Sequence, residues 1–234
     1  EQYARRHGYL EITSDISKTA HAFFERRGFQ VVQAQDNNIR GQVLVNFKMR
    51  KSLHPIKHVA VLSSHVSATP VGGTLAAPVL SAMGIEAHVF PTTLLGRHPG
   101  LGAPGGGAVS PDIFSSMLDG AVKAGLFSRL SVIQTGYFAT TDQIKHAITL
   151  IDAAKNTTNP PHVIVDPILG DTDTGLYVAK DIANLIKTEL LPRADVTTPN
   201  VWELAFLTDT PDQPASPEAV LTIADKLPCT VLTT

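Results

Sequence analysis

The stretch HVIVDPILGDTDTGLYVAKDIANLIKTELLPRADVTTPN, residues 162–200, decides the fold class, because it places a helix pattern between two strand patterns. HVIVDP at 162–167 predicts a buried strand, VAKDIANLIKTELL at 178–191 predicts a helix, and ADVTTPN at 194–200 predicts a short second strand. Two strands joined by a helical crossover are typical of a parallel sheet.

The same alternation continues on both sides of this stretch. We expect further strands at 58–64, 86–92, 130–136 and 229–234, and further helices at 73–83, 111–125, 140–155, 200–207 and 216–227. This order predicts an α/β fold with a doubly wound, mostly parallel sheet.

Composition and charge narrow the class of partner. The chain of 234 residues is 43% hydrophobic and 17% charged, as a soluble globular protein is, and its formal net charge is −2. So small a charge favours neither nucleic acid nor an anionic membrane, and we expect neither as a partner. The first residues are polar and charged, unlike a secretory signal, and the expected location is the cytoplasm. The single Cys229 excludes an intramolecular disulfide, and we expect it to be a buried apolar residue.

Charge also divides the chain into two unequal pieces. Residues 1–53 hold nine Lys and Arg against five Asp and Glu, whereas residues 54–234 hold ten against sixteen. The sign changes at KMRKSLHPIKH, residues 48–58, which we interpret as a linker. We therefore place a domain boundary near Leu53.

The first piece is expected to be a β-α-β-β tail. Strand patterns lie at 9–15, 29–35 and 42–49, and the helix pattern at 17–28 has Ser17 as its expected N-cap and Gly28 at its expected end. A piece of this size is too small to bury a convincing core by itself.

Polar residues follow the apolar runs of successive predicted strands. Because ligands of open α/β sheets bind beyond the carboxyl ends of the strands, these residues are candidates for one site. They are Ser63, Ser64, Thr92, Thr93, Thr135, Tyr137, Asp166, Thr198, Asn200, Thr233 and Thr234. Hydroxyl and amide groups in such a row predict a small polar ligand.

Carboxylates in or near this row predict a metal–phosphate group. Asp166 and Asp171 suit Mg²⁺, and Glu203 lies one helical turn from Asn200, where it is expected to face the same crevice. Two of these residues have simpler explanations, since Asp166 before Pro167 is typical of a turn and Asn200 is typical of a helix cap. For any single residue the simpler explanation is favoured, whereas the joint pattern favours a site.

The Gly- and Pro-rich segment at 96–107 contains GLGAPG at 100–105, which matches the dinucleotide-binding spacing G-x-G-x-x-G. That motif must lie tightly between a strand and a helix, and here Pro104 interrupts it in mid-loop, so we interpret the segment as a mobile flap. His98 in this flap is left open between a solvated histidine and a ligand contact.

Residues 57–234 resemble the pyridoxal/pyridoxine kinases of the ribokinase-like superfamily. The resemblance rests on VDPILGDTDTGLYV at 165–178 and LLPRADVTTPNVWELAFLTD at 190–209, with QTGYFAT, FPTTLLGRHPG and SSHVSATPVGG in the expected order. It implies a ribokinase-like fold and transfer of the γ-phosphoryl group of ATP to the 5′-hydroxyl of pyridoxal or a related B6 vitamer. A homodimer, and a monovalent cation beside Mg²⁺, are left open.

The resemblance also implies a role for individual residues. The residues expected to bind the vitamer are Ser64, Val71, Thr92, His98 and Tyr137. Those expected to organise Mg²⁺ are Asp166 and Glu203, and those expected to face ATP are Asp171, Tyr177, Asn200 and Thr233.

The chain departs from the family pattern in three places. In the first loop, Thr69 stands where the family has Gly and Gly73 where it has Asn, so the B6 form that fits is left open. Asp209 stands where the family's L-T-G has Gly. The motif G-T-G-D, whose Asp is the general base, is expected beyond Thr234, so we expect no catalytic base in this chain and no phosphorylation of pyridoxal by residues 1–234 as given.

Residues 1–53 resemble the C-terminal end of a GNAT-family N-acetyltransferase. AHAFFERRGF at 20–29 is similar to the helix–turn–strand near the end of that fold. The acetyl-CoA pyrophosphate loop is expected before Glu1, so this piece is expected to bind acetyl-CoA poorly or not at all.

The leading hypothesis is a pyridoxal kinase-like domain that lacks its C-terminal catalytic part, behind an acetyltransferase fragment. The alternatives are acetyl transfer as the main activity, a hydroxymethylpyrimidine kinase, and a non-catalytic B6-binding remnant. An upstream Gly-rich pyrophosphate loop would favour acetyl transfer, and pyridoxal binding without ATPase activity would favour the remnant.

Overall fold

The computed structural model describes residues 1–39, 41–53, 57–210, 213–214 and 216–233. The chain divides into two compact units, Glu1–Ile56 and Lys57–Thr234, and each is described here by itself.

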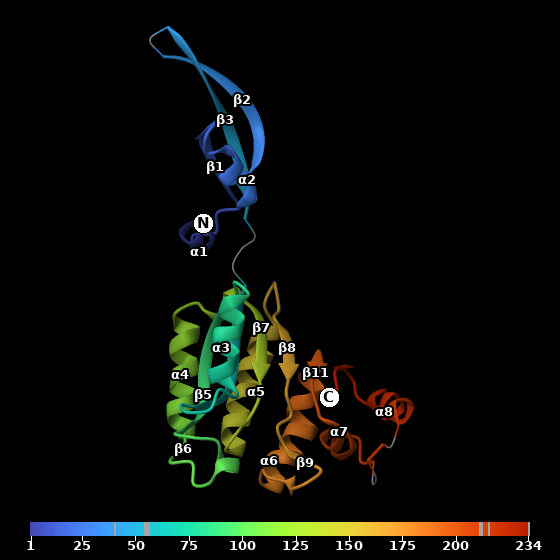
Figure 1. Ribbon diagram of the computed structural model, residues 1–234. Coiled ribbons are helices and arrows are strands. Elements are labelled where there is room, and N and C mark those ends of the chain that lie inside the picture. The colour runs from blue at the N-terminus through green and yellow to red at the C-terminus, as the bar shows by residue number, and fades with distance from the viewer. Residues whose placement is uncertain (40, 54–56, 211–212, 215, 234) are drawn as a thin grey trace. The chain divides into compact units, whose positions relative to one another are not determined.

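The first unit is a three-stranded antiparallel sheet with two short helices (Figure 1). Its elements are α1 (Gln2–Arg6), β1 (Glu11–Ser17), α2 (His21–Arg26), β2 (Gln30–Ile39) and β3 (Gln42–Ser52), and the strand order is β1-β3-β2. The strand and helix patterns predicted for this piece are therefore confirmed in order and type.

The core of the first unit is small, as its length predicts. Ile16, Phe29 and Met49 form its buried apolar cluster among the described residues, with Phe24 and Phe47 among the partly buried side chains against it. Many large apolar side chains of this unit stay exposed: Tyr3, Tyr9, Leu10, Phe23, Val31, Val32, Val43, Leu44 and Val45.

The helix boundaries in this unit differ in part from the prediction. Ser17 was expected to cap α2, but it is the last residue of β1, and the N-cap is Ala20. Gly28 does end the helix: its φ is +80°, its N–H donates to Glu25 O at 2.8 Å, and Phe29 N–H donates to Phe24 O at 3.0 Å.

The predicted linker at 48–58 is wrong over its first part. Strand β3 continues to Ser52 and pairs with β1 there, because Met49 on the inner face is fully buried while its basic neighbours face outward. Leu53 is also buried, and its N–H donates to Leu10 O at 2.7 Å. Residues 54–56, where the second predicted domain begins, lie outside the described residues.

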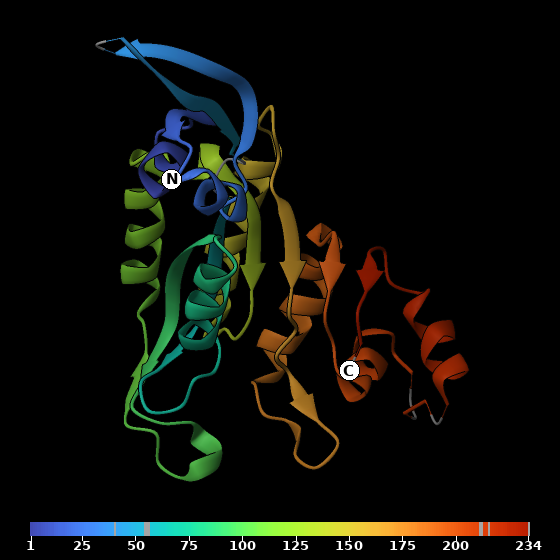
Figure 2. The same ribbon diagram turned by 45° about the horizontal axis from the view of Figure 1, so that its top comes forward.

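The second unit contains a sheet of seven strands within the described ranges. They are β4 (His58–Val66), β5 (Glu86–Leu95), β6 (Gly106–Ala108), β7 (Leu130–Thr135), β8 (His162–Val165), β11 (Val196–Thr197) and β12 (Thr230–Val231). The order is β12-β11-β8-β7-β4-β5-β6, and all neighbours are parallel except β6, which pairs antiparallel with β5. Figure 2 shows the arrows of β7, β8 and β11 ending at one edge. The mostly parallel α/β sheet is confirmed.

The helices of this unit follow their strands in the predicted order. They are α3 (Gly73–Ala82), α4 (Pro111–Lys123), α5 (Thr141–Lys155), α6 (Lys180–Leu185), α7 (Val201–Leu207) and α8 (Pro217–Ala224). Helix α6 continues as a π-helical turn, η3 (Ile186–Leu190), and a 3₁₀ turn, η4 (Leu191–Arg193). Two further 3₁₀ turns, η1 (Pro99–Leu101) and η2 (Phe127–Arg129), and a two-stranded ribbon of β9 (Gly170–Asp171) and β10 (Gly175–Leu176) were not predicted.

Helices cover both faces of the large sheet. Ala60 and Leu62 of β4 belong to the main hydrophobic cluster with side chains of α4, α5 and α6. Val61 lies on the opposite face, because successive side chains of a strand alternate, and its register partner is Val89 of β5. A Cβ atom at Gly73 would come within 2.6 Å of Val89 Cγ1, so α3 packs on that second face.

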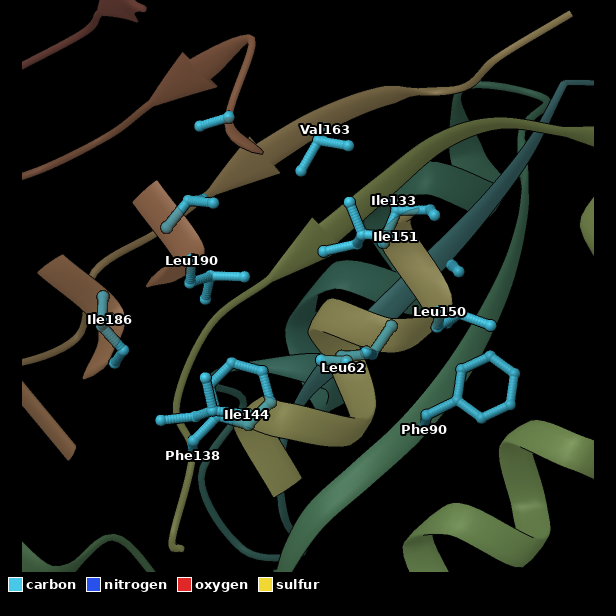
Figure 3. Close-up of a cluster of buried hydrophobic side chains, with 14 of the residues drawn as sticks. Leu62, Phe90, Ile133, Phe138, Ile144, Leu150, Ile151, Val163, Ile186 and Leu190 are labelled. Carbon is cyan, nitrogen blue, oxygen red and sulfur yellow. The ribbon is translucent and has the colours of Figure 1, made fainter. Parts of the chain in front are cut away.

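The main core lies between the sheet and α5. Figure 3 shows Ile144 and Ile151 of α5 facing Leu62 and Ile133 of the strands. All four side chains are fully buried, and each such burial is worth about 1.5–3 kcal/mol. In the part of the chain that is described, no helix has the length and apolar character needed to cross a membrane.

Candidate functional site

The carboxyl ends of the parallel strands meet at one edge of the large sheet, which we call the carboxyl edge. Backbone hydrogen bonds continue past the strand ends there: Asp166 N–H donates to Thr135 O at 3.0 Å, and Thr198 N–H donates to Val165 O at 3.1 Å. The structure therefore brings the residues that follow β7, β8 and β11 side by side.

The Asp166 carboxylate lies partly buried directly after β8. Thr198 Oγ1 donates to Asp166 Oδ1 at 3.0 Å and is the one hydrogen-bond donor to this carboxylate among the described residues. Burial raises the pKa of Asp166, and the Thr198 hydrogen bond opposes the rise. A desolvated carboxylate with a single donor keeps lone pairs for a cation, so Asp166 fits a divalent metal ion such as Mg²⁺.

The Glu203 carboxylate is almost fully buried and is committed to the backbone. Oε1 accepts hydrogen bonds from Leu169 N–H at 2.8 Å and Gly170 N–H at 3.4 Å, and Oε2 accepts one from Asn200 N–H at 2.9 Å. Burial raises the pKa of Glu203, and these three bonds oppose the rise. Glu203 therefore ties the loop after β8 to the start of α7.

Asn200 is the N-cap of α7, the simpler of the two explanations that the sequence left open. Its Oδ1 accepts from Glu203 N–H at 2.9 Å, which completes a capping box, and its Nδ2 donates to Gly170 O at 2.9 Å. The Asn200 side chain thus joins the helix start to β9 and leaves one amide hydrogen for a ligand.

Asp171 closes the turn between β9 and β10. Its Oδ1 accepts from Asp173 N–H at 3.0 Å, Thr174 N–H at 2.8 Å and Thr174 Oγ1 at 2.6 Å, and the bonds from Thr174 lower the pKa of this exposed carboxylate most. Tyr177 follows the ribbon and is half exposed. The turn therefore holds a negative charge beside the carboxyl edge.

The pKa of Tyr177 reflects the acidic groups near it. This pKa is raised to about 12, mostly by burial, with further contributions from the charges of Glu203, Asp171 and Asp166 and from Tyr137. Hydrogen bonds join the segments that carry these groups, since Leu169 N–H donates to Glu203 Oε1 at 2.8 Å and Tyr177 N–H donates to Leu169 O at 3.0 Å.

Thr92 was expected to contact the vitamer, but the structure buries it completely. Its Oγ1 donates to Tyr137 O at 2.6 Å, so the hydroxyl is used by the backbone that follows β7, the second strand along in the sheet order. Thr92 therefore helps to position the Tyr137 backbone.

Gln143 is a residue of this edge that the sequence analysis missed. It is fully buried in the first turn of α5, where Nε2 donates to Thr92 O at 2.9 Å and Val109 O at 2.7 Å, and Oε1 accepts from Ala139 N–H at 3.0 Å. The signal was present in the T-x-x-Q spacing that starts at Thr140, which is typical of a capping box.

The loop after β4 folds back on Ser64. Gly72 has φ +55°, and a Cβ atom there would lie 2.5 Å from Ser64 Oγ, so this position requires glycine. The fold-back places Val71, which is partly buried, close to the end of β4. Thr69 has an ordinary backbone, since Asp209 is the one non-glycine residue with positive φ in the described ranges. Thr69 therefore does not adopt a backbone conformation that only glycine favours.

His98 lies exposed in the predicted flap, where its Nδ1 accepts from Gly100 N–H at 3.1 Å. Its own N–H donates to Thr69 Oγ1 at 3.4 Å, and Arg97 Nε donates to Ala103 O at 2.9 Å. The flap is thus folded on itself and held to the loop after β4. GLGAPG does not lie between a strand and a helix, so its rejection as a dinucleotide motif is confirmed.

Three buried hydroxyls near strand ends have no hydrogen-bond partner among the described residues. They are Thr93 Oγ1, Thr135 Oγ1 and Thr233 Oγ1. Buried polar groups are normally satisfied, so these hydroxyls can serve a ligand or bound water. Thr234, the last candidate of the row, lies outside the described residues.

Comparison with known proteins shows which proteins this chain is similar to. A protein-family model described as phosphomethylpyrimidine kinase matches residues 108–233, more than half of the chain. The chain is 32% identical over 180 residues to pyridoxal kinase PdxY of Corynebacterium diphtheriae, which covers 76% of this chain and 63% of that protein.

Solved structures are similar as well. Pyridoxal kinase from Entamoeba histolytica superposes with a TM-score of 0.66 at 28% identity and covers 72% of this chain and 59% of that one. Pyridoxal kinase from Leishmania donovani in complex with ADP and ginkgotoxin superposes with a TM-score of 0.64 at 25% identity and covers 73% and 60%. The chain therefore spans less than two thirds of the length of these relatives, and it belongs to the phosphomethylpyrimidine kinase family.

Proposed function

We propose that the carboxyl edge of the large sheet binds a B6 vitamer and ATP with Mg²⁺, and that the protein transfers the γ-phosphoryl group of ATP to the vitamer's 5′-hydroxyl. The observation that carries the proposal is that hydrogen bonds hold the loop with Asp166 and Asp171 against Glu203 and Tyr177: Leu169 N–H donates to Glu203 Oε1 at 2.8 Å, and Tyr177 N–H donates to Leu169 O at 3.0 Å. Phosphoryl transfer requires negative groups that hold a cation, and a site that fixes two substrates in line. The similarity to pyridoxal kinases over 76% and 73% of this chain supports the choice of vitamer and nucleotide.

On the metal side, Asp166 holds the divalent cation, directly or through its waters, because its carboxylate has lone pairs to spare. The cation supplies positive charge that neutralises the phosphate oxygens when it is bound. Glu203 supports this site by fixing the backbone of Leu169 and Gly170, since both of its oxygens already accept backbone hydrogen bonds. The expected role of Glu203 in organising Mg²⁺ is thus proposed to be indirect.

On the nucleotide side, Asp171, Tyr177, Asn200 and Thr233 are proposed to face ATP. The free amide hydrogen of Asn200 and the unpartnered hydroxyl of Thr233 are suitable donors to phosphate oxygens. Asp171 acts by holding the β9–β10 turn, on which Tyr177 is placed.

On the vitamer side, Tyr137, Ser64 and Val71 are proposed to line the ring pocket. Thr92 contributes by holding the Tyr137 backbone. The flap with His98 covers the ring from the side of the loop after β4, to which it is hydrogen bonded. A covered site excludes water, which would otherwise compete as the phosphoryl acceptor.

A second candidate is a pyrimidine substrate such as hydroxymethylpyrimidine, since the matching family model is described as phosphomethylpyrimidine kinase. The two candidates are distinguished by titrating the chain with each compound in separate experiments. Tighter binding of the pyrimidine would reassign the substrate while leaving the location of the site unchanged.

The experiment that tests the proposal measures binding of a non-hydrolysable ATP analogue with and without Mg²⁺ by calorimetry. Asp166→Asn should remove the Mg²⁺-dependent part of the affinity, about tenfold or more. Asp142→Asn, an exposed aspartate on α5, is the matched control and should bind as the unaltered chain does. Equal Mg²⁺ dependence in both variants would contradict the proposal.

Catalytic turnover by this polypeptide is a separate question. The sequence contains no G-T-G-D, and we propose that residues 1–234 bind substrates without phosphorylating them. ATP turnover with pyridoxal above background would show this to be wrong. The acetyltransferase resemblance of residues 1–53 stays a prediction, and no activity is proposed for it.

A further inference from the structure

Three side chains of metal-binding type lie together at the amino edge of the large sheet, opposite the carboxyl edge. His58 is the first residue of β4, Glu86 is the first residue of β5, and His88 follows two residues later. The register pairs His58 with Glu86 and Ala60 with His88. Since alternate residues of a strand share a face, all three side chains project to the same side of the sheet.

The distances between the ligand atoms suit chelation. His58 Nδ1 and His88 Nε2 lie 3.0 Å apart, and the two rings are stacked with an interplanar angle of 20°. One ligand atom from each of His58, Glu86 and His88 lies within 4.8 Å of the others. In a tetrahedral Zn²⁺ site with Zn–N bonds of 2.0–2.1 Å, two nitrogens stand about 3.3 Å apart. In the free chain these two nitrogens form a hydrogen bond, and a shared metal ion would replace the hydrogen between them at a similar separation, with the donor imidazole taking its other neutral tautomer.

The surroundings of the pair lower the pKa of both imidazoles. Burial lowers the pKa of both His58 and His88, and the charge of Arg129 lowers both further, whereas Glu86 opposes the shift. A neutral imidazole has one ring nitrogen with a lone pair, and this is the form of histidine that binds a metal. The carboxylate of Glu86 supplies negative charge that compensates the positive charge of a divalent ion, which the nearby Arg129 would otherwise repel.

The position of the cluster gives it an open side. All three residues are only partly buried, unlike the core residues of the same strands. On the same face, Phe90 is buried in the main cluster, and its ring lies 6.2 Å from the ring of Phe127 of η2 in a tilted arrangement. The cluster offers three protein ligands and leaves a fourth position for water, which is a coordination number common for Zn²⁺.

We propose that His58, Glu86 and His88 form a binding site for a divalent transition-metal ion such as Zn²⁺, which fastens β4 to β5 at the amino edge. Two imidazoles and one carboxylate favour Zn²⁺, Co²⁺ or Ni²⁺ over Mg²⁺ and Ca²⁺, which prefer oxygen ligands. The site is separate from the proposed phosphoryl-transfer site: Ser64 lies six residues along β4 from His58, about 20 Å at the rise of a β-strand. The amino-edge site should also prefer transition-metal ions, whereas the proposed phosphoryl-transfer site should prefer Mg²⁺.

The test uses the chain of residues 1–234, purified without a polyhistidine tag and stripped with a chelator. Calorimetric titration with Zn²⁺ should show one saturable site that excess Mg²⁺ does not displace. Zn²⁺ should also raise the Tm of the second unit by about 5 °C at saturating concentration, and chelator should reverse the shift.

Variants distinguish this site from adventitious binding. His58→Ala with His88→Ala should abolish the site and the Tm shift, and Glu86→Gln should weaken binding about tenfold. His162→Ala, an exposed histidine at the start of β8, is the matched control and should keep full affinity. Unchanged Zn²⁺ binding in the double variant, or no saturable site in the unaltered chain, would overturn the proposal.

A Co²⁺ spectrum covers the case in which the double variant does not fold. Co²⁺ bound to the unaltered chain should give the intense visible absorption of tetrahedral coordination, and Glu86→Gln should change its shape. A spectrum that is weak, or that Glu86→Gln leaves unaltered, would contradict the proposed ligand set.

Discussion

Asn200 and Glu203 satisfy each other at the start of α7: Glu203 N–H donates to Asn200 Oδ1 at 2.9 Å, and Asn200 N–H donates to Glu203 Oε2 at 2.9 Å. The second oxygen of Glu203 reaches the loop after β8 through Leu169 N–H. One buried carboxylate therefore sets the position of a helix N-terminus and of the loop that follows Asp166.

Glu203→Ala should destabilise the second unit by roughly 3 kcal/mol, because the buried N–H groups of Leu169 and Gly170 would lose their acceptor. Urea unfolding measures the change. Glu218→Ala, in the first turn of α8 and exposed, is the control and should cost about 0.5 kcal/mol or less. Equal losses for the two variants would show that the Glu203 bonds contribute nothing beyond a surface carboxylate.

Asp166→Asn should stabilise the free protein at neutral pH. Burial raises the pKa of Asp166 above its ordinary value of 3.8, so the folded state binds this proton more tightly than the unfolded state does. The resulting stability is present below about pH 3.8 and is lost as the pH rises through the folded pKa. The gain from Asp166→Asn should therefore be seen at pH 7 and shrink toward pH 4.

Asp142→Asn is the control for this prediction, and its expected effect on stability at pH 7 has the opposite sign. A hydrogen bond from Lys145 lowers the pKa of exposed Asp142, so its contribution is present above the unfolded pKa and is lost as the pH falls. Asp142→Asn should then lower stability slightly at pH 7. If Asp166→Asn also lowered stability at pH 7, burial would not be the dominant influence on Asp166.

Gln143→Ala should cost roughly 3 kcal/mol, since two backbone carbonyls and the Ala139 N–H would lose their partners and a small cavity would remain. It should also weaken vitamer binding, because Thr92 and Tyr137 would no longer be held in place. Lys145→Ala on the exposed face of α5 controls for the helix itself. A stable Gln143→Ala chain with unaltered affinity would argue against this positioning role.

Position 209 should prefer glycine to alanine by about 1 kcal/mol, because Asp209 has φ +52° after the end of α7. Asp209 forms an ion pair with Lys187, and both substitutions remove it, so the comparison isolates the backbone. At Asp225, which ends α8 with φ −62°, alanine should be preferred instead. Thermal unfolding of the four variants measures both preferences, and the same order at both positions would refute the backbone explanation.

The parallel sheet could be predicted from the sequence because its strands and helices carry long, regular apolar patterns. The pairs β9–β10 and the strand β6 could not, since each has only two or three residues, rich in Gly, and their pairing depends on tertiary contacts. The linker at 48–52 was misread because basic side chains on the outer face of β3 hide the alternation that buries Met49.

The candidate site could be located from the sequence, but the use of each side chain could not. Position at a strand end brought Thr92 and Asn200 into the site, and Glu203 followed because it lies one helical turn from Asn200; the structure shows how the polar atoms of all three are used by the backbone. The His58–Glu86–His88 cluster went unnoticed because its residues become neighbours only through the register of β4 and β5.

The measurement that tests the central claim most directly is hydrogen–deuterium exchange of residues 1–234 with pyridoxal and a non-hydrolysable ATP analogue plus Mg²⁺. Ligand should protect amides at the carboxyl edge, in peptides that cover 63–72, 135–139 and 166–177. The amino edge at 58–60 and 86–88 should exchange as in the free chain. No protection at the carboxyl edge, or protection confined to the amino edge, would contradict the proposed site.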